Sequence, residues 1–268
     1  MEWFEAVLLG LVQGLTEFLP VSSSGHLAIG REILGVKASD DLVFEVTVHA
    51  ATVLATIIVF RKQIWALLCG LFKFRYNDET DYIFKICVSM IPIFIVGVFF
   101  KDQVEALFSS LAVVGAGLLV TSCLLFFSDR FAARRSPDAP AARGGISYLQ
   151  ALVIGISQAF AVVPGLSRSG TTISTGLLCG VRREDVAQFS FLMVLVPILG
   201  EALLDLVSGE MAASSVGTGA LLPGFLSAFV SGVFACKVMI AIVKKAKLKW
   251  FALYCLAVGA AVLIFTLL

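Results

Sequence analysis

Six stretches of this chain are apolar over 17 to 23 residues each. A helix that crosses a bilayer needs about 20 predominantly apolar residues, with a range of about 17 to 25. Inside the bilayer no water satisfies the peptide groups, so only helices and closed barrels can cross it. The sequence therefore predicts an all-α integral membrane protein with six transmembrane helices, at about residues 42–60, 82–100, 111–127, 186–206, 221–243 and 250–268.

Composition excludes the main alternatives. The chain has 268 residues, of which 59% are hydrophobic, and its mean hydropathy is +0.98. These values exclude an ordinary soluble domain and a disordered chain. The net charge of +1 provides no basic field that would recruit nucleic acid, so we expect none as a partner.

Two shorter apolar segments are interrupted by polar residues. The first runs from Glu5 to Phe18, is broken at Pro20, and is followed by a second short helix predicted at about His26 to Leu34. The second, Tyr148–Val163, ends in Pro-Gly-Leu-Ser-Arg-Ser-Gly. Polar, non-helical backbone at membrane depth is tolerated only where protein buries it or where it lines a watery cavity. We interpret both segments as re-entrant helical hairpins that form a site; an ordinary surface loop is the alternative for the first.

The two hairpins are related by an internal repeat. With an offset of 145 residues and no gap, Gln13 aligns with Gln158, Ser22 with Ser167, and Ser24-Gly25 with Ser169-Gly170. Three predicted spans separate the hairpins, so they would enter from opposite faces, as in an inverted-topology repeat. We predict a single membrane domain, with repeat 1 at about 1–128, repeat 2 at about 146–268, and a cytoplasmic linker at 129–145.

The distribution of basic residues predicts the orientation. On this topology one side carries 15 of the 20 Lys and Arg residues and the other carries 3. Cytoplasmic loops have an excess of Lys and Arg. We therefore expect the basic side in the cytoplasm and both termini outside.

In an inverted repeat the two broken segments meet near the midplane. Helix N-termini attract anions, and the guanidinium of Arg168 can bind phosphate oxygens in bidentate fashion. We expect a phosphate or pyrophosphate site, in which Ser23 or a neighbour attacks phosphorus and His26 acts as base or acid. Glu17 would then orient His26 or hold a divalent cation. Direct attack by His26, or by water activated by Glu17 and a metal ion, stays open.

The stretches Gln13-Gly-Leu-Thr-Glu-Phe-Leu-Pro-Val-Ser-Ser-Ser-Gly-His26 and Pro164-Gly-Leu-Ser-Arg-Ser-Gly-Thr-Thr172 resemble the two signature motifs of the undecaprenyl pyrophosphate phosphatases, the bacitracin-resistance membrane family. The resemblance covers the whole chain. It implies removal of the terminal phosphate from a C55 isoprenoid pyrophosphate, which recycles the lipid carrier for cell-wall polymers and gives bacitracin resistance. It also implies a divalent cation, Mg or Ca, and an active site that opens to the outer face.

Carried onto matching positions, the resemblance assigns catalytic roles to Ser23, His26, Glu17 and Arg168. The family's pair of acidic or amide residues is Gln13 and Glu17, and Gln13 puts a metal site made of two carboxylates in doubt. The residues expected to contact the pyrophosphate are Gln13, Ser22, Ser24, Gly25, Ser167, Ser169, Gly170 and Thr172.

Three further points stay open. A transporter or flippase for an anionic polyprenyl phosphate lipid could use the same inverted repeat. Glu45 and His49 lie one helical turn apart and either line the cavity or mark a helix end in interfacial water. A homodimer is compatible with these features, but the sequence does not determine the oligomeric state.

Overall fold

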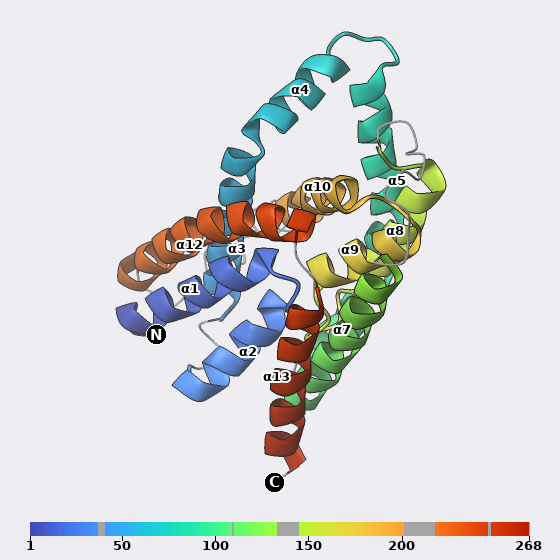
Figure 1. Cartoon of the computed structure of the whole chain (residues 1–268). Helices are drawn as coiled ribbons and strands as arrows, with labels where there is room; N and C mark the ends of the chain where they lie inside the picture. The colour runs from blue at the N-terminus through green and yellow to red at the C-terminus, as the bar shows by residue number, and fades with distance from the viewer. Residues whose placement is uncertain (37–40, 109, 133–144, 201–217, 246–247, 268) are drawn as a thin grey trace.

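We describe a computed structural model of the chain, which covers residues 1–36, 41–108, 110–132, 145–200, 218–245 and 248–267 (Figure 1). Within these ranges the chain is helical and contains no strand. The helices are α1 (Trp3–Phe18), α2 (Ser23–Leu34), α3 (Asp41–Val59), α4 (Arg61–Leu71), α5 (Asp78–Phe99), α6 (Lys101–Leu107), α7 (Leu111–Ala132), α8 (Tyr148–Phe160), α9 (Arg168–Leu178), α10 (Arg183–Met193), α12 (Thr218–Lys245) and α13 (Lys249–Leu267).

Four of these helices, α5, α7, α12 and α13, are long and apolar enough to cross a membrane. Helices α3 and α4 together also meet this test, although they are bent by 76° at their junction. The described residues therefore hold four such helices, or five if the bent pair is one span. This number confirms an all-helical, multi-pass membrane protein.

A further helix follows the first predicted span. Residues 42–60 correspond to α3, and the chain continues as the helix α4 between the predicted spans at 42–60 and 82–100, where we predicted no helix. The residues at the start of α4 are charged or polar, so the apolar run does not continue into it. However, Ile64 and Leu67 pack against the hydrophobic core, and this apolar contact is enough to stabilise a helix. Helix α5 also begins earlier than predicted, at Asp78, because Asn77 caps it by accepting a hydrogen bond from the Thr80 N–H.

The predicted span at 186–206 is not one continuous helix in the described part of the chain. Helix α10 ends at Met193, a turn follows at Val194, and residues 195–200 are again helical. The rest of this predicted span lies outside the described residues. Residues 133–144 of the predicted linker also lie outside the described residues. The first residues of that linker belong to α7, which extends to Ala132.

The two halves of the chain pack across each other (Figure 1). Helix α1 lies along α12, and α8 lies along α5, so each broken helix packs on a long helix of the opposite half. Helix α7 contacts α13, α9 and α2. This arrangement brings the C-terminal end of α1 and the N-terminal ends of α2 and α9 to the centre of the molecule.

Glycines permit the close approach in both halves. A Cβ atom added at Gly10 of α1 would lie 2.3 Å from the carbonyl oxygen of Gly224 in α12. A Cβ atom at Gly155 of α8 would likewise lie 2.3 Å from the carbonyl oxygen of Ser89 in α5. Small residues let backbones approach closely in membrane helix pairs, and here they occur at positions related by the 145-residue offset.

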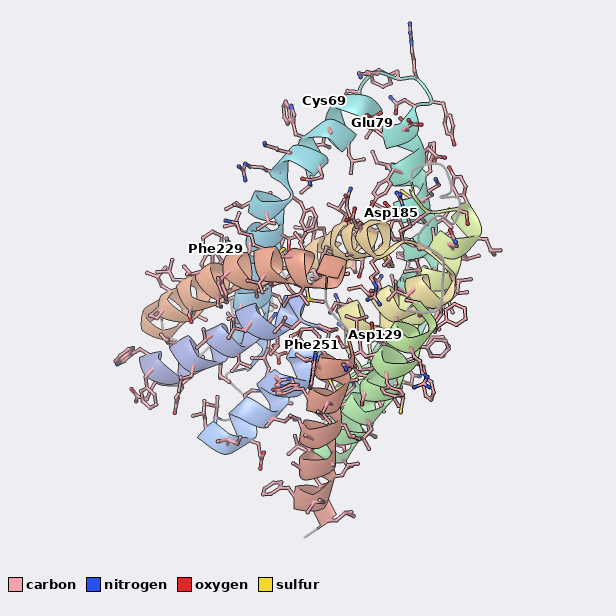
Figure 2. The ribbon with its side chains drawn as sticks, viewed as in Figure 1. Cys69, Glu79, Asp129, Asp185, Phe229 and Phe251 are labelled. Atoms are coloured by element: carbon pink, nitrogen blue, oxygen red, sulfur yellow. The ribbon has the colours of Figure 1, made fainter. Side chains whose placement is uncertain are left out.

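Polar contacts around Asp129 join three helices at the N-terminal end of α13 (Figure 2). Asp129 of α7 accepts a hydrogen bond from Arg183 of α10 at 2.7 Å, and its other oxygen accepts one from the backbone N–H of Lys249 at 3.4 Å. An acceptor at a helix N-terminus satisfies an N–H group that has no partner within the helix. Asp129 therefore caps α13 and connects it to α7 and α10.

Candidate active site

The two broken segments end in helices that begin in the same way. Ser22 is the N-cap of α2 and accepts a hydrogen bond from the backbone N–H of Gly25. Ser167 is the N-cap of α9 and accepts one from Gly170. A serine at this position satisfies one of the free N–H groups and leaves the others pointing out of the helix. Both helices thus present positive N-terminal ends toward the same region.

The break before α2 contains an unusual backbone conformation. Ser22 has φ 71°, in the left-handed region that non-glycine residues seldom adopt. Such a conformation costs of order 1–3 kcal/mol and persists only where the surroundings impose it. Here it turns the chain sharply between α1 and α2, so that Ser23 faces back toward the end of α1.

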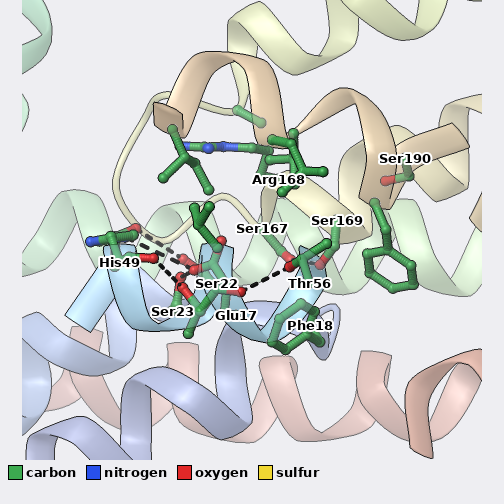
Figure 3. A pocket seen from close by; sticks show the side chains of 18 of the residues that line it. Glu17, Phe18, Ser22, Ser23, His49, Thr56, Ser167, Arg168, Ser169 and Ser190 are labelled. Carbon is green, nitrogen blue, oxygen red and sulfur yellow. Dashed lines mark hydrogen bonds and ion pairs between the residues drawn. The ribbon is translucent and has the colours of Figure 1, made fainter. Parts of the chain in front are cut away.

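A pocket lies between the two breaks and α3 (Figure 3). Its polar wall contains residues from α1, α2, α3 and α9, and its apolar wall contains Phe18, Phe191 and residues around Val194. The described residues that line it are Glu17, Phe18, Ser22, Ser23, Ser24, His49, Thr52, Val53, Thr56, Ala161, Leu166, Ser167, Arg168, Ser169, Ser190, Phe191, Val194, Leu195 and Ile198. The pocket therefore combines hydroxyl, carboxylate, imidazole and guanidinium groups with an apolar surface.

Ser23 forms a short hydrogen bond with Glu17. Its hydroxyl donates to Glu17 Oε2 at 2.5 Å, and the amide of Gln13 donates to the same oxygen at 3.0 Å. Only 11% of the Glu17 side chain is exposed. The carboxylate is thus held by two donors and positioned to accept the serine proton.

Arg168 lies on the opposite side of the pocket from Glu17 and Ser23 (Figure 3). Its Nη1 is buried and has no hydrogen-bond partner among the described residues. An unpartnered buried donor on a cation is costly unless a ligand satisfies it. The guanidinium is therefore well placed to bind an anion in the pocket.

His26 does not form the predicted interaction with Ser23. Its Nδ1 lies 2.8 Å from the carbonyl oxygen of Ser22, and its Nε2 lies 2.8 Å from the hydroxyl of Tyr254 in α13. Because a carbonyl oxygen can only accept, Nδ1 carries a proton and donates it, and in the neutral ring Nε2 accepts from Tyr254. Side chains in a helix point back toward its N-terminus, which places the ring over the turn before α2. Among the described residues, His26 is not part of the pocket lining.

The remaining predicted residues fall into two groups. Ser22, Ser24, Ser167 and Ser169 line the pocket as expected. The backbone N–H groups of Gly25 and Gly170 donate hydrogen bonds to the caps Ser22 and Ser167. The Thr172 hydroxyl lies 2.5 Å from the Ser190 hydroxyl. Neither glycine, nor Thr172, nor Gln13 belongs to the described lining, but Gln13 contacts the lining residue Glu17 through its hydrogen bond.

Helix α3 contributes pocket residues that the motifs do not contain. His49, Thr52 and Thr56 all line the pocket, which resolves the two interpretations left open for His49. His49, Thr52 and Thr56 are spaced by three or four residues in a mostly apolar helix, so they share one face. This spacing is the sequence signal that could have identified them.

The geometry suits chemistry on a phosphoryl group. A hydroxyl that is hydrogen-bonded to a carboxylate is an activated nucleophile. Opposite it stand a guanidinium with a free donor and the positive ends of two helices, which together stabilise negative charge on phosphate oxygens. The apolar wall can accommodate a hydrocarbon chain attached to that phosphate.

Comparison with known proteins identifies the family. The model of the bacitracin resistance protein BacA family matches residues 6–261. An undecaprenyl-diphosphatase of Bacteroides fragilis (strain YCH46) is 54% identical over 268 residues, which cover 98% of each chain. One of Parabacteroides distasonis is 54% identical over 272 residues and covers both chains completely. One of Methanococcus vannielii is 41% identical over 254 residues, 94% of this chain and 95% of the relative. The chain therefore belongs to the BacA family of bacitracin resistance proteins.

Proposed function

We propose that this protein hydrolyses undecaprenyl pyrophosphate to the monophosphate and inorganic phosphate. The hydrogen bond between Ser23 and Glu17, opposite the free guanidinium donor of Arg168, is the observation that carries this proposal. Its relatives named undecaprenyl-diphosphatase supply the substrate class. Removal of one phosphate would return the lipid carrier to cell-wall synthesis and would oppose bacitracin.

The pyrophosphate would bind between the N-terminal ends of α2 and α9. Arg168 would bind oxygens of the terminal phosphate through two parallel N–H groups, which a lysine cannot reproduce. Ser24, Ser167 and Ser169 line the same space and would donate hydroxyl hydrogen bonds. The first isoprene units would lie against Phe18 and Phe191, whose rings pack edge to face at a centroid distance of 6.1 Å.

In the first step the Ser23 oxygen attacks the terminal phosphorus and its proton passes to Glu17. The P–O bond of the anhydride breaks, and the lipid monophosphate leaves. Glu17 gives this proton to the departing phosphate oxygen and is again a carboxylate. Water then attacks the phosphoserine, Glu17 accepts a proton from the water and passes it to the Ser23 oxygen, and inorganic phosphate is released. Positioning and charge stabilisation provide most of the catalysis in phosphoryl transfer.

In this scheme His26 positions the turn and Glu17 is the base. The two hydrogen bonds of the His26 ring, with the Ser22 carbonyl and with the Tyr254 hydroxyl, hold this turn and connect α2 to α13. Attack by His26 itself, or by water without a covalent intermediate, remains a rival that experiment can separate. We therefore propose trapping with substrate labelled in its terminal phosphate.

Serine attack predicts an acid-stable label on the wild-type protein and none on Ser23→Ala. Histidine attack predicts an acid-labile label that survives in Ser23→Ala. Water attack predicts no label at all. A folded variant with Ser22, Ser23 and Ser24 all changed to Ala that still turns over would exclude serine as the nucleophile.

A divalent cation, Mg or Ca, is compatible with this site. The buried oxygen Oε1 of Gln13 has no hydrogen-bond partner in the part of the chain that the structure describes, and Glu17 offers its second carboxylate oxygen. The described residues contain no group of three or more His, Cys, Asp or Glu that could hold a metal. A magnesium ion commonly binds through one or two carboxylates together with substrate phosphates. We therefore propose that Glu17 and Gln13 hold the cation together with the pyrophosphate, whose charge it would neutralise.

We also propose that the chain forms six spans and two re-entrant hairpins in an inverted repeat, in the bacterial plasma membrane. The matching caps at Ser22 and Ser167 and the matching close approaches at Gly10 and Gly155 support this arrangement. The 15-to-3 split of basic residues supports cytoplasmic placement of the loops around α4 and α10, with the termini and the site facing outward.

Labelling with an impermeant thiol reagent tests the orientation. In a background without the six native cysteines, Gln103→Cys should react from outside intact cells and Phe74→Cys should not. External labelling of Phe74→Cys, with Gln103→Cys protected, would reverse the proposed orientation.

The enzymatic proposal is tested by phosphate release from purified, detergent-solubilised protein with undecaprenyl pyrophosphate, with Mg²⁺ and with EDTA. We expect one phosphate per lipid with the ion and a strong loss with EDTA. Folded protein that binds the lipid but releases no phosphate would favour the transporter alternative.

A further inference from the structure

We propose that His49 is a positioning residue that holds Glu17 in place as the base for Ser23. This inference rests on the proposed hydrolysis and adds to it a residue from α3. It is carried by the place of the imidazole in the pocket, by the fixed orientation of its ring, and by the contacts around Glu17.

The pocket imidazole among the described residues is that of His49, because His26 turns toward Tyr254. His49 Nε2 lies 3.9 Å from Glu17 Oε2, the oxygen that accepts the Ser23 hydrogen bond. The His49 side chain is 26% exposed, so water reaches it only partly. The ring is therefore within ion-pair distance of the catalytic carboxylate.

The backbone fixes the orientation of the ring. His49 Nδ1 lies 2.9 Å from the carbonyl oxygen of Glu45, one turn earlier in α3. Because this oxygen only accepts, Nδ1 carries a proton and Nε2 is the ring atom left to interact with Glu17. A hydrogen bond on one ring nitrogen commonly sets the direction of the other in this way.

An ion pair fixes α3 relative to the helix that carries Ser23. Arg31 of α2 lies 2.6 Å from Glu45 of α3, and both side chains are partly buried. The same turn of α3 thus makes contact with α2 through Glu45 and supplies His49 to the pocket. Glu17, Ser23 and His49 come from three helices, and this ion pair connects two of them directly.

The distance between His49 and Glu17 is longer than a hydrogen bond. Catalytic hydrogen bonds are often long in the unliganded enzyme and shorten when substrate binds. A pyrophosphate held by Arg168 would close the pocket around Glu17. A ring protonated at both nitrogens would then donate Nε2–H to Glu17 Oε2 and keep the carboxylate aimed at Ser23.

Variants that copy one ring nitrogen at a time test this inference. A glutamine amide reaches approximately the position of Nε2, whereas an asparagine amide reaches that of Nδ1. We expect His49→Leu to lower kcat about 10- to 100-fold, as is typical when a group that orients a catalytic ligand is lost, with KM changed less than about 3-fold. His49→Gln should stay within about 5-fold of wild type, and His49→Asn should resemble His49→Leu.

The control is Thr47→Val, on the same helix outside the described lining of the pocket, which should retain wild-type turnover. Every variant is compared at equal amounts of monodisperse protein in size-exclusion chromatography. A folded His49→Leu variant with wild-type kcat would overturn the inference, as would equal activity of the Asn and Gln variants. Absence of phosphate release by wild-type protein would instead refute the proposed hydrolysis, so the two failures are distinguishable.

Discussion

The two broken segments share a backbone design but carry different side chains. In the first, Glu17, Ser23 and His26 surround the turn, whereas the corresponding positions in the second hold Val162, Arg168 and Thr171. The helix after each break begins at a serine cap and is followed by a glycine with a positive φ, which is Gly35 after α2 and Gly180 after α9. The same backbone arrangement therefore occurs twice. The first copy carries a nucleophile and its base, and the second carries Arg168, which we call the anion anchor.

The breaks also differ in length and in how they are supported. The first spans residues 19–22, and the second spans residues 161–167. In the second, Gly165 has φ 85°, and a Cβ atom there would lie 2.1 Å from the carbonyl oxygen of Val114 in α7. This close contact with α7 fixes the backbone of the break that precedes Arg168.

The largest expected effect concerns the hairpin that carries the nucleophile. Ser23→Ala and Glu17→Gln should each reduce kcat by about 10³-fold or more, because each removes part of the activated hydroxyl. The matched control is Val162→Ala at the position that corresponds to Glu17, which should change kcat less than about 3-fold. Phosphate release from the lipid substrate measures both. Comparable losses in Val162→Ala and Glu17→Gln would contradict the division of roles between the hairpins.

We expect the second-largest effect at Arg168, the anion anchor. We expect Arg168→Lys to lose about 10²-fold in kcat/KM although the charge is retained, because a lysine cannot form two parallel bonds to phosphate. Arg182→Lys, an exposed basic position beyond α9, is the control and should retain activity. Near-normal kcat/KM in folded Arg168→Lys would show that the residue provides charge alone.

Close packing of the broken helices should affect stability in both halves. Gly10→Ala and Gly155→Ala each place a Cβ atom 2.3 Å from a backbone oxygen. We expect each to destabilise the protein by about 1–3 kcal/mol, as overpacking typically does. Gly97→Ala, where nothing lies within 4 Å, is the control. A thermal shift in only one of the two variants would show that the halves are not supported equivalently.

The caps should produce the smallest effects. Ser167→Ala removes an acceptor from α9 and should cost about 1 kcal/mol. Ser22→Ala loses the equivalent bond in α2 while keeping the left-handed backbone at φ 71°, so we expect a loss at least as large. Thermal unfolding in detergent compares the two. A clearly greater loss in Ser167→Ala would indicate that the turn at Ser22 does not depend on its cap.

Several elements were predictable because their causes are local. The apolar runs predicted α5, α7, α12 and α13 to within a few residues at most ends. The helix after the first break, predicted from about His26, begins three residues earlier, at Ser23, with Ser22 as its N-cap. Helix α4 was missed because its first residues are charged while its apolar face is short. Spacing within α2 favoured a contact between Ser23 and His26, whereas in the structure the turn at Ser22 directs the Ser23 hydroxyl to Glu17.

The sequence alone determined that this chain is an apolar, helical membrane protein with two similar polar breaks. Hydropathy and helix capping depend on residues that are close in the sequence, and the repeat depends on a fixed offset. All three can therefore be recognised from the sequence. Only the tertiary structure decided that His49 of α3 joins the pocket and that the Ser23 hydroxyl meets Glu17 while His26 meets Tyr254. Glu17 and Arg168 line one pocket because α1 packs on α12 and α8 on α5 through close backbone contacts. Such contacts depend on the relative position of whole helices, which no local pattern specifies.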